Sequence, residues 1–417
     1  MPTHHPTPTV DEAFYQPLQG LAAASAYARP CPEFPDEAFL RIGVQRVLES
    51  IPSGRAFLQE HGPRFENAPT QSNYFAALHS PRRLALLTEV NQTLLHLATQ
   101  TLEDRLVGIP ELADYQCFAA DGHWHKGGAH DPRHEGTKMA VGHFYGLNLR
   151  THTLKHLAAG EGWHEHDMSA LKRVKPKGLR QGVPRGQRVL VIYDKAGIDL
   201  DYWKRCRQER AVYFLSRPKE NMIFAWLESR DWDRTDPRNR GIWGDWRVQS
   251  RAGHPLRLIC YIDPAAGQAY EFLTNEPDLP PGVLVELYRR RWEVEKVFDQ
   301  LKNKLDEKKA WASSLGARQV QAQCIALTHN LLLLYEQALA QRHDLTNDAE
   351  DQRRRRRVEA SAQTSRRAGH PLSTLVLEAR GATQRSVKFI RWLRQSIRDK
   401  LAEAIAVPRL KALYANL

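Results

Sequence analysis

The sequence predicts a mixed α/β fold, in which a sheet flanked by helices carries a β-rich insertion and is extended by helical regions at both ends. Three observations support this prediction. Apolar and polar residues alternate from Tyr115 to Lys126, which is typical of a strand. Residues 188–193 form a continuous apolar run, as in a central strand buried on both faces. Residues 284–305 lack Pro and Gly and carry an apolar stripe at helical spacing, which predicts one long helix.

The region from residue 115 to 216 follows the order β-β-β-α-β-α-β, which favours one mixed sheet with helices against it. We expect strands at 115–126, 138–147, 151–158, 188–193 and 211–216, and helices at about 168–175 and 199–210. Residues 217–275 interrupt this alternation with strand-like runs at 257–262 and 269–274, so they are interpreted as a β-rich insertion. The insertion contains four tryptophans, Trp226, Trp232, Trp243 and Trp246.

The chain is accordingly divided into five regions: a loose leader (1–35), a helical N-terminal domain (36–110), the α/β core (111–216 with 276–340), the insertion (217–275) and a helical C-terminal region (341–417). In the N-terminal domain, short helices are broken by tight turns, and Arg82 and Arg83 are expected to be exposed at one of them. Such an arrangement suits a small DNA-binding head, or equally a helical cap on the core.

The C-terminal region begins with a polar stretch, residues 345–371, which is interpreted as a linker before helices at 386–406 and 408–414. It contains five consecutive arginines, Arg353–Arg357. The run could follow DNA phosphates, or it could belong to a solvated linker, and the sequence leaves both interpretations open.

The totals limit the classes of protein to which the chain can belong. With 417 residues, it can form two or three domains, and its net charge of +12 favours a polyanionic partner. The five cysteines show no paired spacing, which argues for reduced thiols in the cytoplasm and against a zinc knuckle or a disulfide framework. Neither a membrane span nor a signal peptide is expected, because no apolar run is long enough and the N-terminus lacks a basic-then-apolar pattern.

One edge of the long helix is polar. Tyr288, Arg291, Glu295 and Lys302 lie within about 60° of one another around its axis, beside the apolar stripe. One acid among hydrogen-bonding and cationic groups suits a phosphate and the metal ion that accompanies it.

Three carboxylates are placed to meet this edge. Asp121 lies in the first strand, Asp194 ends the buried central strand, and Glu295 lies on the long helix. Strand ends and an adjacent helix converge on one crevice in such folds, and three acids there would repel one another without a cation. Carboxylate oxygens favour magnesium or manganese, and two such ions can activate a nucleophile and stabilise the leaving oxygen of a phosphodiester. A structural role as a helix N-cap remains the alternative for Asp194.

The pattern Tyr288-x2-Arg291-x3-Glu295-x6-Lys302 resembles the YREK signature of the DDE transposases of bacterial insertion sequences. FAADGHWHK and VLVIYDKAG, around the two aspartates, resemble the same family, and the likeness extends over roughly residues 115–340. The sequence departs from the family in two places. Gly122-His123 follows the first aspartate where relatives often have a hydroxyl residue nearby, and residues 195–198 replace the more usual Arg-Gly-aromatic.

The resemblance implies a ribonuclease H-like core in which Asp121, Asp194 and Glu295 bind two Mg²⁺ ions, which Mn²⁺ can replace. It implies hydrolysis at transposon ends and attack of the freed 3′-hydroxyl on target DNA, by a homodimer that holds the terminal inverted repeats. Tyr288, Arg291 and Lys302 would grip the DNA end. Relatives often form a hairpin intermediate with a base flipped onto an aromatic side chain, for which one of the insertion tryptophans is a candidate, although core packing is the preferred role for any single one.

The resemblance also implies a bacterial, nucleoid-associated protein in the cytoplasm. Two alternatives stay open. The chain could be a transposase-derived DNA-binding protein that has lost catalysis, or a nuclease with the same core but without strand transfer. Intact acids, together with Arg291 and Lys302, argue against the first of these.

Nine of the 18 histidines lie between residues 123 and 166. They are at positions 123, 125, 130, 134, 143, 152, 156, 164 and 166. One interpretation is a zinc site that includes His123 and His125 on one strand face. We prefer the other, in which the histidines are solvated or face DNA in a basic protein.

Overall fold

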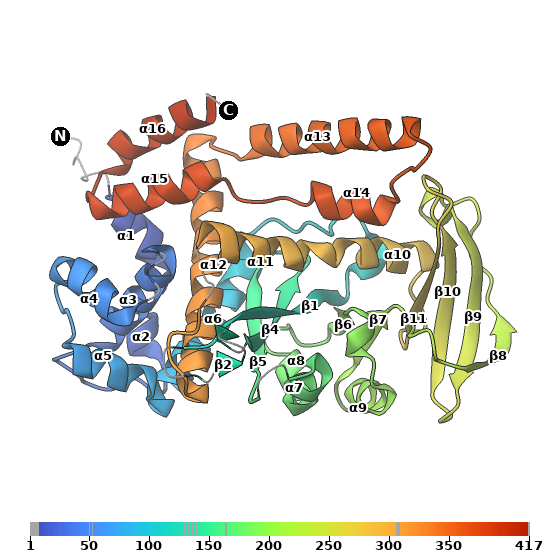
Figure 1. Cartoon of the computed structure of the whole chain (residues 1–417), viewed down its shortest axis with the longest axis horizontal. Helices are drawn as coiled ribbons and strands as arrows, with labels where there is room; N and C mark the ends of the chain where they lie inside the picture. The colour runs from blue at the N-terminus through green and yellow to red at the C-terminus, as the bar shows by residue number, and fades with distance from the viewer. Residues whose placement is uncertain are drawn as a thin grey trace.

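The computed structural model describes residues 8–49, 51, 53–128, 131, 133–134, 137–138, 140–162, 165–305 and 309–415. A nine-stranded sheet runs through the molecule in the order β5-β4-β1-β6-β7-β11-β10-β9-β8. Figure 1 shows the sheet between two groups of helices. The core strands are β1 (Tyr115–Lys126), β4 (Ala140–Asn148), β5 (Leu154–Ala159), β6 (Arg188–Ile192) and β7 (Val212–Ser216), and a separate ribbon pairs β2 (Arg133–His134) with β3 (Thr137–Lys138).

The core half of the sheet has a ribonuclease H-like order. β1 pairs antiparallel with β4, and β4 pairs antiparallel with β5. On its other side β1 pairs parallel with β6, and β6 pairs parallel with β7. Three antiparallel strands followed by two parallel ones, with helices on the faces, confirm the predicted fold class.

Alternating side chains of β1 divide between the two faces of the sheet. Cys117 and Ala119 join the larger core, which includes the apolar residues of α10 (Pro281–Arg290), α11 (Trp292–Lys304) and α12 (Leu315–His343). Phe118 and Ala120 join the smaller core, with α7 (Asp167–Arg173), α8 (Pro176–Leu179) and α9 (Leu200–Arg210). By the same alternation Asp121 lies on the α11 side.

The insertion consists of β8 (Phe224–Ser229), β9 (Ile242–Ser250), β10 (Pro255–Ile262) and β11 (Ala269–Thr274). The sequence predicted β10 and β11, but not β8 and β9. These strands continue the core sheet, because Leu273 and Thr274 of β11 pair antiparallel with Ser216 and Leu215 of β7. The insertion and the core are therefore parts of one sheet.

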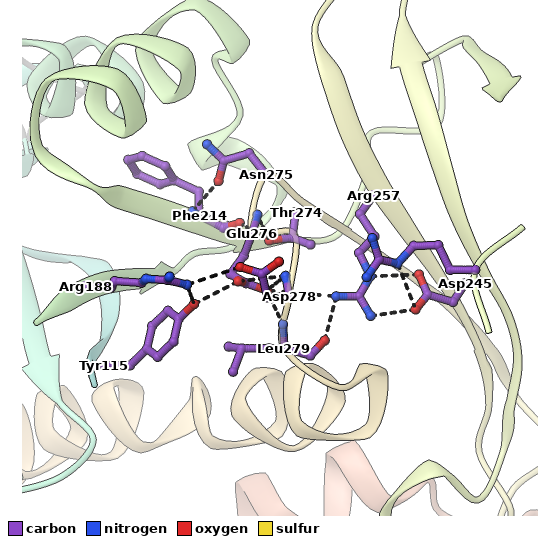
Figure 2. A network of polar contacts seen from close by, with 11 residues as sticks. Tyr115, Arg188, Phe214, Asp245, Arg257, Thr274, Asn275, Glu276, Asp278 and Leu279 are labelled. Carbon is purple, nitrogen blue, oxygen red and sulfur yellow. Dashed lines mark hydrogen bonds and ion pairs between the residues drawn. The ribbon is translucent and has the colours of Figure 1, made fainter. Parts of the chain in front are cut away.

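A polar network fixes the insertion to the core just before α10 (Figure 2). The fully buried Glu276 accepts hydrogen bonds from the Tyr115 hydroxyl at 2.8 Å and from the backbone N–H of Leu279 at 2.8 Å. Arg257 of β10 donates to both carboxylate oxygens of Asp245 on β9, at 2.7 and 2.5 Å, and to the Leu279 carbonyl at 2.6 Å. The network thus connects β1, β9, β10 and the segment that leads into α10.

The N-terminal region contains α1 (Val10–Tyr15), α2 (Leu21–Ala24), α3 (Asp36–Glu49), α4 (Gly54–His61), α5 (Gln71–Leu78) and α6 (Pro81–Thr101). The expectation of a loose leader is wrong for residues 8–35, because Val10 and Phe14, one helical turn apart, are fully buried in the main core. A capping box between Thr9 and Glu12 starts this helix.

The expectation that the two arginines at the start of α6 are exposed at a turn is wrong. Arg82 donates two hydrogen bonds to Asp36, at 2.7 and 2.8 Å, and Arg83 is only 5% exposed. The same region packs against the core through α6, where the Asn91 amide donates to the Gln323 side chain on α12 at 2.7 Å. The N-terminal helices therefore form a cap on the core, whatever else they bind.

The C-terminal region contains α13 (Asp348–Arg367), α14 (Thr374–Gly381), α15 (Val387–Arg398) and α16 (Glu403–Ala415). The predicted linker is wrong, since α13 is a helix of 20 residues with acids in its first turn and arginines in its last. The predicted helix 386–406 is also interrupted, because Lys400 has a left-handed backbone (φ 49°) between α15 and α16. None of the helices in the described part of the chain has the length and apolar character that a membrane span requires.

Candidate active site

Asp121 and Asp194 come from adjacent parallel strands. Asp121 follows Ala119 on the α11 face of β1, and Asp194 lies two residues beyond the last residue of β6. One carboxylate oxygen of Asp194 accepts a hydrogen bond from the Ala196 N–H at 2.8 Å and so caps the short helix of residues 195–197. The structural N-cap role considered for Asp194 is therefore present, and its other oxygen takes no part in that cap.

Arg291 connects the first and third predicted acids. Its guanidinium lies 3.3 Å from Asp121 Oδ2 and 2.9 Å from Glu295 Oε1. The arginine is 5% exposed and stands at the junction of α10 and α11, which lie end to end in Figure 1. The predicted single helix is therefore two helices in line, with the interruption at the residue that binds both acids.

The acids influence one another electrostatically. Burial, helped by the charges of Glu295 and Asp194 and opposed by that of Arg291, raises the pKa of Asp121 to about 7. Burial also raises the pKa of Glu295, to which the charge of Asp194 again contributes. The charge of Asp194 thus acts on both Asp121 and Glu295, so the three predicted acids lie within electrostatic reach of one another.

The chemistry of these donors fits a hard divalent cation. Carboxylate oxygens that are partly desolvated and mutually repulsive gain most from such an ion. Among the described residues, no three His, Cys, Asp or Glu side chains already form a metal-binding group. Arg291 is instead the cation between Asp121 and Glu295, so its guanidinium would have to move aside for an ion to bind both.

The other two polar residues of the helix edge differ in position. Tyr288 is 5% exposed, with its ring 4.9 Å from that of Phe272 and 5.8 Å from the Arg291 guanidinium. Lys302 is half-buried two turns beyond Glu295, where its charge helps to lower the pKa of His125. Tyr288 therefore lies with the acids, whereas Lys302 lies towards the far end of β1.

Sequence reasoning missed one exposed cation of this site. Arg217 directly follows β7, and its charge, with that of Arg291, lowers the pKa of Tyr288 against the larger effect of burial. A signal was available, because β7 is the parallel neighbour of β6 and the carboxyl ends of parallel strands lie on the same edge of a sheet.

The insertion exposes two of its tryptophans. Trp226 and Trp243 are each 55% exposed, so core packing is wrong for these two. Trp226 contacts Trp246 edge-on, with the ring centroids 5.4 Å apart. Trp243 lies at a register shift between β9 and β10, the kind of irregularity that redirects a side chain.

The histidines of the core strands are neither solvated nor a metal site within the described residues. His123 and His143 are fully buried, His125 is 4% exposed, and the rings of His125 and His143 are 4.8 Å apart. Burial lowers the pKa of His125 to about 4. These histidines therefore serve as neutral packing groups behind Asp121. His130 and His164 lie outside the described residues, and only the backbone of residue 134 is described.

The family model described as transposase DDE domain matches residues 113–331, from the start of β1 into α12. No curated protein matches the sequence. Among solved structures, the piggyBac transposase synaptic complex with hairpin DNA aligns with 96% of this chain and 81% of that chain, at 11% identity and a TM-score of 0.34. Since the family model covers more than half of the 417 residues and includes all three acids, the chain belongs to the transposase DDE domain family.

Proposed function

We propose that this chain is a transposase of the bacterial insertion-sequence type. It cleaves DNA at transposon ends and joins the freed 3′-hydroxyl to target DNA. The observation that carries the proposal is the meeting of Asp121, Asp194 and Glu295 beside Arg291, inside the matched domain. The arginine compensates the charge of the acids, and its guanidinium suits a phosphate equally well once a metal ion takes its place between them.

Asp121, Asp194 and Glu295 would hold two Mg²⁺ ions, which Mn²⁺ can replace. When bound, such ions activate the attacking oxygen and stabilise the leaving one. Arg291 would transfer its guanidinium from the acids to a phosphate oxygen, and the Tyr288 ring, 5.8 Å from that guanidinium, would help to hold it. Lys302 would contact the DNA further along α11, and the exposed Arg217 would contact it at the end of β7.

The protein would act as a homodimer on the two terminal inverted repeats, associated with the bacterial nucleoid. The N-terminal region, residues 36–110, would bind the ends while it caps the core. If a hairpin forms on the donor DNA, Trp226 and Trp243 offer the exposed ring faces that a flipped base requires.

The test is strand cleavage and joining on a plasmid that carries the element's own ends, in magnesium. Glu295→Gln should abolish both steps. Glu286→Gln is the matched control, because Glu286 lies on the same run of helix but about 180° from Glu295 around its axis. Full activity of Glu295→Gln would refute the assigned site.

The two alternatives give different outcomes. A nuclease without strand transfer would degrade pre-cleaved ends and never join them to target DNA. A DNA-binding derivative would bind the ends and cleave nothing, and Glu295→Gln would leave its binding unchanged.

A further inference from the structure

Helix α13 is unlike every other long helix of the described chain, because none of its 20 residues is buried. It lies on the outside of the molecule, and α14 lies between it and α10 (Figure 1). Its only large apolar side chain is Val358. A helix that contributes so little to the core has its surface available for another purpose.

The outward surface of α13 is a cationic stripe. At about 100° per residue, seven positions from Arg353 onward fall within one arc of about 120° on this surface, and the exposed Arg355, Glu359 and Arg366 lie outside it. The stripe consists of Arg353, Arg356, Arg357, Ala360, Gln363, Thr364 and Arg367. It contains no acid, and its small residues leave the space between the arginines open. Arg356, Arg357 and Arg367 are exposed and make no hydrogen bond or ion pair with the part of the chain that the structure describes.

The inner surface of α13 fixes this orientation. Arg354 donates to the carbonyls of Ala382 and Gln384, at 2.9 and 3.2 Å, and pairs with Asp351 at 3.2 Å. Arg354 and the acids beside it therefore attach α13 to the segment that follows α14. The remaining arginines of the run are left facing outward.

A cationic hollow of about 430 Å³ adjoins the stripe. It is lined by Lys304, Arg354, Arg357 and Arg380, and Glu350 is the one acid in its lining. Lys304 is the last residue of α11, the helix that carries Glu295. Cationic side chains thus line the surface between the end of α11 and α13.

We propose that the stripe of α13 and the adjoining hollow bind the phosphate backbone of duplex DNA, along a path that continues from α11. The inference rests on the proposed function, from which it takes DNA as the substrate. Arg353 to Arg367 spans about 21 Å, the length of about six phosphates of one strand. Guanidinium groups suit phosphate oxygens, and the lack of an apolar face makes α13 unsuited to entering a lipid surface.

The chain offers a matched pair of double variants. R356A/R367A removes two arginines from the stripe, and R355A/R366A removes two exposed arginines with the same spacing from the same helix, outside the stripe. Binding of a fluorescein-labelled duplex of random sequence is followed by anisotropy over a series of NaCl concentrations. Unchanged circular dichroism and thermal midpoints establish that both variants are folded.

The stripe variant should lower the slope of log K against log salt by about 2, which corresponds to about 60-fold weaker binding at about 0.1 M salt. The control should stay within about twofold of the wild type. Equal losses in the two variants, or no loss in either, would overturn the assignment of this surface. A wild type that binds no duplex would instead refute the proposed function. The wild type and both variants are also tested for binding to phosphatidylserine vesicles. If R356A/R367A alone lost vesicle binding and still bound the duplex like the wild type, the stripe would be assigned to lipid headgroups and the proposal overturned.

Discussion

The buried histidines should make the folded protein sensitive to mild acid. His125 and His143 pack side by side with 4% and 0% exposure. Burial lowers the pKa of His125 from 6.5 to about 4, with help from the charges of Arg318 and Lys302, and it lowers the pKa of His143 well below 6.5. The unfolded chain therefore binds protons at a higher pH than the folded one. The stability gained from neutral histidines is complete above pH 6.5 and is lost as the pH falls towards 4.

The magnitude follows from the width of that interval. Each pH unit below the unfolded pKa costs about 1.4 kcal/mol for every histidine that only the unfolded chain protonates. From about pH 6.5 to 5 this amounts to about 2 kcal/mol for each histidine and about 4 kcal/mol for the pair. A loss of this size is a large part of the 5–15 kcal/mol that is typical of a folded domain, so it should be easy to measure.

The assay is urea unfolding, followed by tryptophan fluorescence at pH 7 and pH 5, for the wild type and His143→Phe. The variant should lose about 2 kcal/mol less between the two pH values than the wild type. Its packing cost is present at both pH values and so cancels in that difference. His96→Phe, at an exposed position, should behave like the wild type. If His143→Phe and the wild type lost the same stability on acidification, the reasoning would be refuted.

Two further predictions concern the polar network that fixes the insertion to the core, and the acid cluster. Arg257→Ala removes the principal partner of the buried Asp245 and should lower the free energy of unfolding by about 3–5 kcal/mol, whereas Arg247→Ala, which breaks only an exposed ion pair, should cost less than about 1 kcal/mol in the same urea titrations. Similar losses of unfolding free energy in the two variants would contradict the role of this network. Because the pKa of Asp121 is raised to about 7, Mn²⁺ binding measured by electron paramagnetic resonance should weaken by about tenfold for each pH unit below 7. Binding that does not change between pH 5 and 7 would show that this carboxylate is not a ligand.

The core of the fold was predictable because its signals are local. A strand buried on both faces needs a continuous apolar run, and β6 has one. The alternation of β1 placed Asp121 on a definite face, and Asp194 followed a strand end. The contact of Arg291 with Asp121 was not predictable, because the two residues are far apart in the sequence. The periodicity of a strand or helix indicates the face on which a side chain lies, but not how close it comes to a side chain of another element.

The errors have physical causes of their own. Helix α13 has no apolar stripe, so periodicity could not reveal it, and its arginines resembled those of a solvated linker. The histidines of β1 lie on one face of the strand, as the alternation predicted. An imidazole is tolerated in a core when neutral and on a surface when charged, so the sequence could not decide whether that face is buried or exposed. Strand β8 is exposed at five of its six positions, and β9 mixes buried, half-buried and exposed positions without strict alternation, which weakens the pattern by which strands are found.

The pairing of β7 with β11 has a consequence for any attempt to simplify this protein. If residues 217–275 were removed, β7 would end the sheet, and its free backbone N–H and C=O groups would offer a template for strands of other molecules. The natural boundary, β8, is better protected, since it is irregular in register beside Trp226 and carries Glu228 in an ion pair with Arg247. A shortened core should therefore aggregate, and the strands of the insertion protect the edge of the core sheet as well as extending it.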